Sequence, residues 1–267
     1  MCIRDDFYLK AIILFSISTL IGLSLLFSFE SNAYALGPEL KPDLRTIVPT
    51  QIQLVNDHQR EMLRFSNGIA NTGIGFWQMR PEFPTFNSTD QTQKAFQMLL
   101  DKDGNLVREV PIGEFAYHPA HHHWHVADVA DFVVRAGSPT GQIVGHTVKS
   151  SFCLLDVFKL DDNSPTKERT YWYCLGGYQG ISPGWADEYH QSLEGQDVDI
   201  TGIPLGTYYL VSKVNPDGIF VEDNLNNNQA WTEFKLTRDS NGNPKIDVTG
   251  HSQCDSPSLC GNHPTNR

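Results

Sequence analysis

Short stretches of alternating apolar and polar residues run along most of the chain, and glycine and proline interrupt them throughout. Five stretches are rich in β-branched and aromatic residues and are bounded by Gly, Pro, Asn or Asp, a pattern typical of strands: residues 64–69, 126–134, 151–158, 207–214 and 229–236. The pattern predicts a mostly β fold, an antiparallel β-sandwich-like single domain with long loops and few short helices.

Three further segments complete the expected layout. Residues 207–236 resemble a strand, an Asn-rich connection and a returning strand. Residues 91–101 have the pattern of a helix, and we expect the polar tail from Asp239 onward to be irregular.

The N-terminal segment predicts export. Residues 11–27 carry no charge, follow Arg4 and Lys10, and precede the small-x-small sequence Ala33-Tyr34-Ala35. We interpret residues 1–35 as a signal peptide. An uncleaved anchor is the alternative, because the apolar run is just long enough to span a bilayer. Both interpretations place residues 36–267 outside the cytoplasm, either secreted or extracytoplasmic.

The charge of the chain argues against nucleic acid as a partner. The formal charge is −11, and removing two basic and three acidic residues with segment 1–35 leaves −10. Proteins that bind nucleic acid present a basic surface, so the sign here is wrong. A negative field instead attracts cationic molecules.

The cysteines of residues 36–267 predict disulfides. Four remain after Cys2 is removed with the signal segment, and an even number in an oxidising compartment suggests two bridges. The simplest pairing is Cys153 with Cys174 and Cys254 with Cys260, although four cysteines allow three connectivities. A metal site from Cys254, Cys260 and His263 is a further alternative.

The densest chemical feature is a group of histidines. Five of the ten histidines lie within residues 118–125, and clustered imidazoles indicate a transition metal. On a flat strand His121, His123 and His125 share a face, but the outer two are about 13 Å apart, too far for one ion. A helical stripe that includes His118 is the other arrangement. We expect a curled loop, because residues 126–134 continue as a strand.

Ordered motifs around these histidines resemble the lysyl oxidase family. The spacing His121-x-His123-x-His125 is similar to the copper-binding segment of that family. In the family's order follow Gly145-His146, Lys149-Ser150-Ser151-Phe152-Cys153, the run from Gln179 to Tyr189, and Asp199-Ile200-Thr201. Flanking matches include Leu63-Arg64-Phe65, Asn71-Thr72-Gly73, Gly206-Thr207-Tyr208-Tyr209-Leu210 and Val214-Asn215-Pro216. The resemblance covers most of residues 36–267.

The resemblance implies a catalytic domain over residues 36–267 and a role for each matching residue. His121, His123 and His125 would bind copper, and Lys149 and Tyr189 would be joined into lysine tyrosylquinone. The implied reaction is oxidative deamination of a primary amine, either peptidyl lysine or a small amine. It consumes molecular oxygen and yields an aldehyde, ammonia and hydrogen peroxide.

The general base is the least defined of the implied roles. A carboxylate must take the α-proton of the amine, and Asp187 and Asp128 are the candidates, with Asp187 preferred. The family's histidine beyond the copper motif has no counterpart among residues 130–132, and Ala120 replaces the cysteine of its vertebrate members. The resemblance therefore leaves Cys153 as the partner of Cys174.

A second metal site is also implied. Residues 222–228 are similar to the family's calcium loop, whose oxygen ligands suit calcium; the candidate ligands are Asp43, the carbonyl of Leu44, Glu222, Asn224, Asn227 and Asn228. An ordinary Asn-rich turn explains the same residues. For the whole chain, the alternative to an oxidase is an extracellular copper-binding β-sandwich protein that forms no quinone.

Overall fold

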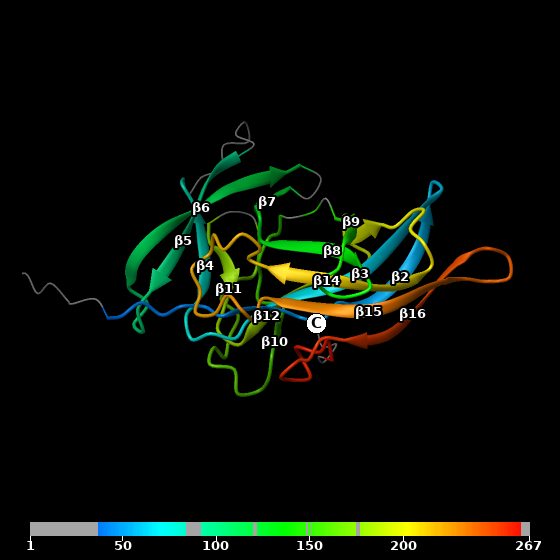
Figure 1. Ribbon diagram of the computed structural model, residues 1–267. Helices are drawn as coiled ribbons and strands as arrows, with labels where there is room; N and C mark the ends of the chain where they lie inside the picture. Colours follow the sequence, from blue (N-terminus) through cyan, green and yellow to red (C-terminus); the bar gives the residue numbers. More distant parts are fainter. Residues whose placement is uncertain are drawn as a thin grey trace, which may run out of the picture. The chain divides into compact units, whose positions relative to one another are not determined.

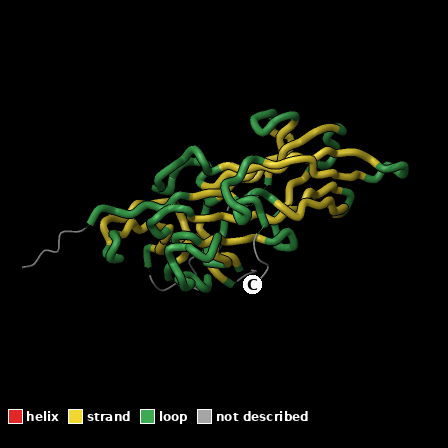
Figure 2. Tube along the Cα trace, turned by 90° about the horizontal axis from the view of Figure 1, so that it is seen from below, coloured by secondary structure: helices red, strands yellow, loops and turns green. Residues whose placement is uncertain are grey.

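Three antiparallel sheets contain all the strands of the described residues (Figure 1). A computed structural model describes residues 37–83, 92–119, 122–147, 149, 151–174 and 177–262. The expected signal segment 1–35 lies outside the described residues. Within them there are sixteen strands and no helix, and Figure 2 accordingly shows only strand and loop along the described trace. The mostly β prediction is confirmed.

The first sheet is built around β3, a long strand that pairs with four others; we call it the β3 sheet. Its main order is β1-β3-β12-β10, and β2 and β13 also pair with β3. The strands are β1 (Leu44–Thr46), β2 (Thr50–Asp57), β3 (Arg60–Asn71), β10 (Phe158–Lys159), β12 (Trp185–Tyr189) and β13 (Asp197–Asp199).

The second sheet, which we call the histidine sheet, has the order β11-β4-β5-β6-β7. Its strands are β4 (Trp77–Pro81), β5 (Thr92–Leu100), β6 (Leu106–His118), β7 (His123–Val126) and β11 (Gln179–Ile181). The third, the β14 sheet, has the order β16-β15-β14-β8-β9. Its strands are β8 (Ala130–Ala136), β9 (Ile143–His146), β14 (Gly206–Val214), β15 (Gln229–Arg238) and β16 (Pro244–His251).

Three of the five expected strands are confirmed. Residues 64–69 lie within β3, and residues 207–214 and 229–236 form β14 and β15, which pair antiparallel as expected. Residues 126–134 are not one strand, because the chain turns at Asp128, whose φ of 55° ends β7 before β8 begins.

The expected helix and the expected irregular tail are both wrong. Residues 91–101 contain strand β5, which pairs with β4 and β6, so tertiary pairing overrides the helical pattern. The tail is not irregular throughout: residues 244–251 form the edge strand β16, whose polarity reflects its exposed face.

Residues 151–158 are largely irregular, although they are apolar. They make one isolated bridge at Phe152 and reach a strand only at Phe158. Their other backbone amides form hydrogen bonds outside any strand pairing. The amide of Leu155 donates to the Asp187 carboxylate, and the amide of Asp156 donates to the carbonyl of Tyr171. Its apolar residues Phe152, Leu154 and Phe158 are buried without forming a continuous strand.

One apolar core joins the three sheets. Phe65 of the β3 sheet packs against Phe132 of the β14 sheet, with ring centroids 5.1 Å apart. Trp77 of the histidine sheet meets Phe220 edge-on at 5.0 Å. All four rings are almost fully buried, and a buried side chain of this size stabilises the fold by about 1.5–3 kcal/mol.

Both expected disulfides are confirmed. Cys153 is bonded to Cys174, and Cys254 is bonded to Cys260. The pairing of Cys254 with Cys260 excludes a metal site on these two thiolates while the bridge is intact. Among the described residues no segment is a helix long and apolar enough to cross a membrane.

Gly73 provides a test of the packing between the N-terminal segment and the turn after β3. A Cβ atom there would lie 2.6 Å from the carbonyl carbon of Pro42 and closer still to the amide nitrogen of Asp43. Because backbone cannot yield like a flexible side chain, Gly73→Ala should lower the free energy of unfolding by about 2–4 kcal/mol in urea titrations. Gly250→Ala, which adds a Cβ atom in open space, should change it little. Equal stability of the two variants would contradict this packing.

Candidate active site

The described histidines of the 118–125 cluster lie on a hairpin of the histidine sheet. Strands β6 and β7 pair so that His118 is opposite His123 and Ala116 is opposite His125. His122, with φ at 57°, belongs to the turn between the strands. His121 lies outside the described residues. The curled loop expected here is wrong for residues 123–126, because pairing with β6 holds them extended.

His123 and His125 converge on one face of β7. Their Nε2 atoms are 2.9 Å apart, and their ring centroids are separated by 4.8 Å. Two nitrogens bound to one ion at ~2.0 Å are separated by about 2.8–3.3 Å for bond angles of ~90–109°. The two imidazoles therefore have the spacing of ligands to a single metal.

Neighbouring side chains orient this pair. Ser151 Oγ lies 3.4 Å from His125 Nδ1, which leaves Nε2 of the same ring facing His123. The ring of His118 stacks on His125 at 5.1 Å. Within the part of the chain that the structure describes, no three His, Cys, Asp or Glu side chains form a metal-binding group.

Lys149 and Tyr189 lie together although 40 residues separate them in sequence. Lys149 Nζ is 5.4 Å from the centroid of the Tyr189 ring and donates a hydrogen bond of 3.0 Å to the Glu194 carbonyl. Tyr189 is the last residue of β12, and Lys149 follows β9 of another sheet. Burial lowers the pKa of Lys149, which increases its neutral, nucleophilic fraction.

The Tyr189 hydroxyl lies in a buried polar group. It is 2.8 Å from Asp187 Oδ2 and also contacts the carbonyl oxygen of Cys153. A phenol has one proton. Both contacts are satisfied when Tyr189 donates to Cys153 and a protonated Asp187 donates to the tyrosine oxygen.

The pKa of Asp187 supports this arrangement. Burial raises it from 3.8 to about 7, against the lowering effect of the hydrogen bonds from Tyr189 and from the amides of Leu155 and Glu188. Burial, with the neighbouring Asp187 carboxylate, also holds the pKa of Tyr189 well above 10. Asp187 can therefore hold or release a proton near neutral pH, directly beside the tyrosine.

Phe152 joins the histidines to the Lys149–Tyr189 pair. Its amide donates to the Val126 carbonyl at 3.0 Å, and the Val126 amide donates to the Phe152 carbonyl at 2.7 Å. Its ring meets Tyr189 edge-on at 4.6 Å, and Lys149 Nζ lies 5.4 Å from its centroid.

The Cys153–Cys174 disulfide makes a second link. The Cys153 carbonyl accepts the Tyr189 hydroxyl, and the Cys174 carbonyl accepts the amide of Trp124 at 3.4 Å. Trp124 lies between the two convergent histidines, so one bridge connects both halves of the site.

Asp128, the second candidate base, lies apart from the buried group of Tyr189. It is exposed at the turn after β7, where it lines a cavity of about 540 Å³ together with Lys149. The structure thus places Asp187 at the tyrosine and Asp128 at an opening beside the lysine.

The candidate calcium ligands divide into two groups. In the first, Asn227 Nδ2 lies 3.0 and 3.2 Å from the two carboxylate oxygens of Asp43. Asn227 Oδ1 is buried and makes no hydrogen bond. Asn224 lies in the adjoining exposed turn, where its Oδ1 accepts the Asn226 amide.

The second group surrounds the buried carboxylate of Glu222, whose pKa is raised by burial. Glu222 accepts hydrogen bonds from the amide of Leu44 at 2.9 Å and from Asn228 Nδ2 at 2.8 Å. Asn228 Oδ1 is buried without a partner. Each carboxylate therefore faces the Nδ2 atom of an asparagine whose buried amide oxygen makes no hydrogen bond, and oxygens of both kinds suit a hard cation.

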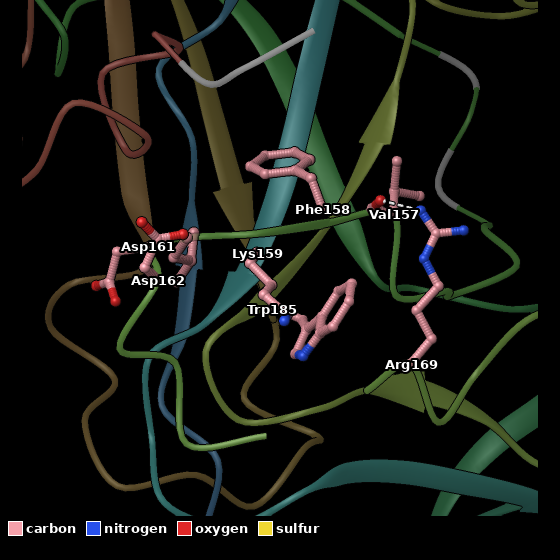
Figure 3. A pocket seen from close by; sticks show the side chains of 8 residues that line it. Val157, Phe158, Lys159, Asp161, Asp162, Arg169 and Trp185 are labelled. Carbon is pink, nitrogen blue, oxygen red and sulfur yellow. Dashed lines mark hydrogen bonds between the residues drawn. The ribbon is translucent and has the colours of Figure 1, made fainter. Parts of the chain in front are cut away.

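A separate cavity of about 440 Å³ lies at the other end of β12 (Figure 3). There Trp185 lies between Lys159 and Arg169, whose charged groups are 5.4 and 5.9 Å from its ring. Asp161 and Asp162 also line this cavity. None of the candidate site residues does, so it is distinct from the histidine and tyrosine region.

Several groups that orient the site were not found from the sequence. The backbone carbonyls of Cys153 and Glu194 carry no residue-type signal, because any residue supplies a carbonyl. Stacking of His118 on His125 depends on the register of the hairpin, which the sequence leaves open. The apolar character of Phe152 was visible, but its contact with Tyr189 was not.

Comparisons with known proteins agree on one family. A family model described as lysyl oxidase matches residues 101–243. Human lysyl oxidase homolog 1 is 33% identical over 127 residues, which cover 48% of this chain and 21% of that protein. Pig protein-lysine 6-oxidase is 29% identical over 127 residues, which cover 48% of this chain and 49% of that protein. Human lysyl oxidase homolog 4 is 33% identical over 125 residues, which cover 45% of this chain and 15% of that protein. The aligned part spans half or less of each relative.

The raised pKa of Asp187 predicts a specific pH dependence of stability. Between about pH 4 and 7 the folded state keeps a proton that the unfolded chain has lost, so this group makes folding less favourable as the pH rises. Asp187→Asn cannot ionise. Its free energy of unfolding should therefore rise relative to the parent chain by up to ~4 kcal/mol between pH 4 and 8.

Urea titrations of the protein without added metal at several pH values measure this difference. Tyr189→Phe retains the carboxylate but removes a hydrogen bond that lowers its pKa, so the decrease in stability should persist and extend to higher pH. A difference between Asp187→Asn and the parent that stays constant with pH would show that the pKa of Asp187 is not raised by folding.

Proposed function

Because the chain belongs to the lysyl oxidase family, we propose that it is a secreted, copper-dependent amine oxidase with a lysine tyrosylquinone made from Lys149 and Tyr189. The observation that carries the proposal is the placement of Lys149 Nζ beside the ring of Tyr189, 5.4 Å from its centroid. The overall reaction converts a primary amine, oxygen and water into an aldehyde, ammonia and hydrogen peroxide.

Copper would be held by His121, His123 and His125. The 2.9 Å separation of the His123 and His125 Nε2 atoms fits the chemistry of such a centre. When bound, copper supplies the reaction with oxygen that converts the tyrosine ring into a quinone. Ser151 and the pairing of β7 with β6 keep the described imidazoles in place.

Lys149 supplies the nucleophile for the cross-link. Its amine must be neutral to attack, and partial burial favours that form. Rotation about the torsions of the lysine side chain carries Nζ from its position over the ring to a ring carbon. Phe152 packs against both residues and limits the space into which either can turn.

Asp187 is the proposed general base. It contacts the Tyr189 oxygen, and its pKa of about 7 lets it accept and release protons near neutral pH. The exposed Asp128 is the alternative, since it lines a cavity with Lys149. The direct contact with the tyrosine favours Asp187.

Calcium is the second proposed cofactor. Asp43, Glu222, Asn227 and Asn228, with Asn224 and the Leu44 carbonyl, would bind it through oxygen. The two buried amide oxygens without hydrogen bonds support this assignment. Such an ion would tie the segment before β1 to the loop between β14 and β15, and would therefore act on stability.

The two disulfides fit an oxidising compartment and hence a secreted or extracytoplasmic protein. The substrate is a primary amine, either a small molecule or a lysine side chain of a protein. A copper-binding protein that never forms the quinone is the alternative function.

Peptide mass spectrometry tests the cofactor directly. After copper loading in air, the purified chain should yield one joined species containing the peptides of Lys149 and Tyr189, and it should release peroxide with a primary amine. Lys149→Ala and Tyr189→Phe should lose both the joined species and peroxide formation while retaining copper. His123→Ala should lose copper as well.

Two other residues provide matched controls. Lys159 Nζ also lies 5.4 Å from an aromatic ring, and the hydroxyl of Tyr208, like that of Tyr189, donates to a backbone carbonyl. Lys159→Ala and Tyr208→Phe should retain the joined species and the activity. Asp187→Asn should slow turnover by about 10²–10⁴-fold. Full copper occupancy with separate, unmodified peptides would favour the copper-binding alternative.

Removal of calcium should lower thermal stability. At a free calcium concentration ~100-fold above Kd, binding stabilises the fold by about 2.7 kcal/mol, which corresponds to a Tm shift of about 5–10 °C. Copper-free protein melted in EGTA and after calcium addition measures the shift. Asp43→Asn should reduce it, whereas Asp239→Asn, in another Asn-rich turn, should not. Identical melting with and without calcium would argue against the site.

A further inference from the structure

The loop between β12 and β13, residues 190–196, contacts both members of the proposed cross-link. It follows Tyr189 directly, and the carbonyl of Glu194 accepts the hydrogen bond of 3.0 Å from Lys149 Nζ. Gln196, buried at the end of the loop, donates from Nε2 to the Tyr189 carbonyl at 3.3 Å. One short loop therefore holds the lysine amine and the backbone of the tyrosine together.

Gly195 lets this loop approach the lysine closely. Its φ is 74°, a left-handed conformation that glycine adopts without strain. A Cβ atom there would lie 3.1 Å from both Cβ and Cδ of Lys149. Carbon atoms in ordinary van der Waals contact are about 3.5–4.0 Å apart, so even the methyl group of an alanine would press on the lysine side chain. The absence of a side chain at position 195 therefore sets how near the loop lies to Lys149.

The hydroxyl of Thr147 ties the backbone of Lys149 to the same loop. Its Oγ1 donates to the Gly195 carbonyl at 3.2 Å and accepts the Lys149 amide at 3.2 Å. Thr147 is buried, and its own amide donates to the Phe132 carbonyl of β8 at 3.1 Å. One hydroxyl, anchored on the β14 sheet, thus links the loop to the backbone of the lysine.

We propose that Gly195 and Thr147 are positioning residues for the cross-link, which hold the lysine side chain over the ring of Tyr189 before the two are joined. This inference rests on the proposed function. In the joining step a bond forms between Lys149 Nζ and a carbon of the oxidised ring, one N–H and one ring C–H bond break, and molecular oxygen takes up the two hydrogens as hydrogen peroxide. Once formed, the covalent bond itself holds the lysine. Gly195 and Thr147 therefore control the rate of joining and have little effect on later turnover.

The test follows the joined Lys149–Tyr189 species by peptide mass spectrometry at intervals after copper is added in air. Gly195→Ala should slow its formation by about 10-fold or more, since a displacement of ~1 Å can lower a rate by about 10²-fold. Gly202→Ala is the matched control. Its φ is 76°, and its Cβ atom would meet no atom of the described residues within 4 Å, so it adds the same backbone strain without contact to the lysine. It should form the joined species at the parent rate.

A pair of threonine variants tests the hydroxyl. Thr147→Val removes it at nearly constant shape and should slow joining by roughly 3- to 10-fold, whereas Thr147→Ser retains it and should stay close to the parent. In protein without added metal, hydrogen-exchange NMR should show the Lys149 amide exchanging roughly 5-fold faster in Thr147→Val, because this amide loses its acceptor. In all variants kcat per joined site should remain near the parent value.

The outcomes separate the two proposals. If the parent forms the joined species and Gly195→Ala and Thr147→Val form it equally fast, the positioning role is wrong and the oxidase stands. Equal slowing in Gly195→Ala and Gly202→Ala, or in both threonine variants, or a parallel loss of kcat per joined site, would also overturn it. If Gly195→Ala does not fold, the threonine pair decides. If the parent, with full copper occupancy, forms no joined species and oxidises no amine, the oxidase and the positioning role fall together.

Discussion

The two backbone hydrogen bonds between Val126 and Phe152 are the constraint on which the candidate site depends. They fix the end of the histidine strand against an irregular segment that has no sheet of its own. Phe152 in turn packs on Tyr189, and Ser151 contacts His125. Because a short backbone bridge leaves little freedom, the imidazoles and the tyrosine ring are positioned by the same peptide units.

Burial of the tyrosine has consequences for both chemistry and stability. Tyr189 is half-buried, and among the described residues Asp187 is the titratable group hydrogen-bonded to its hydroxyl. The same desolvation that raises the pKa of Asp187 makes its ionised form unfavourable for folding. A group suited to proton transfer near pH 7 therefore makes the fold less stable there, a trade common at active sites.

How far the sequence could predict this structure depended on what each residue type signals. Alternation identified β14 and β15. The even number of cysteines predicted two disulfides, and the simplest of three possible pairings was the one found. Sequence patterns gave the wrong prediction for β5, where strand pairing on both sides outweighs the helical pattern. They were also wrong for residues 151–158, where buried apolar residues resemble the pattern of a strand. Sequence motifs identified Lys149 and Tyr189 as candidate site residues. Their proximity depends on the packing of two sheets, which no local sequence pattern predicts.

The Cys153–Cys174 bridge suggests how a site of this kind can lack the cysteine that precedes the first histidine in vertebrate members. Here that position is Ala120, yet the bridge still reaches the histidine strand, because the Cys174 carbonyl accepts the amide of Trp124. Its other end supports the Tyr189 hydroxyl through the Cys153 carbonyl. The bridge thus reaches the histidine strand through a hydrogen bond and connects the two halves of the candidate site. Histidine strand and tyrosine are therefore linked here without a cysteine at position 120.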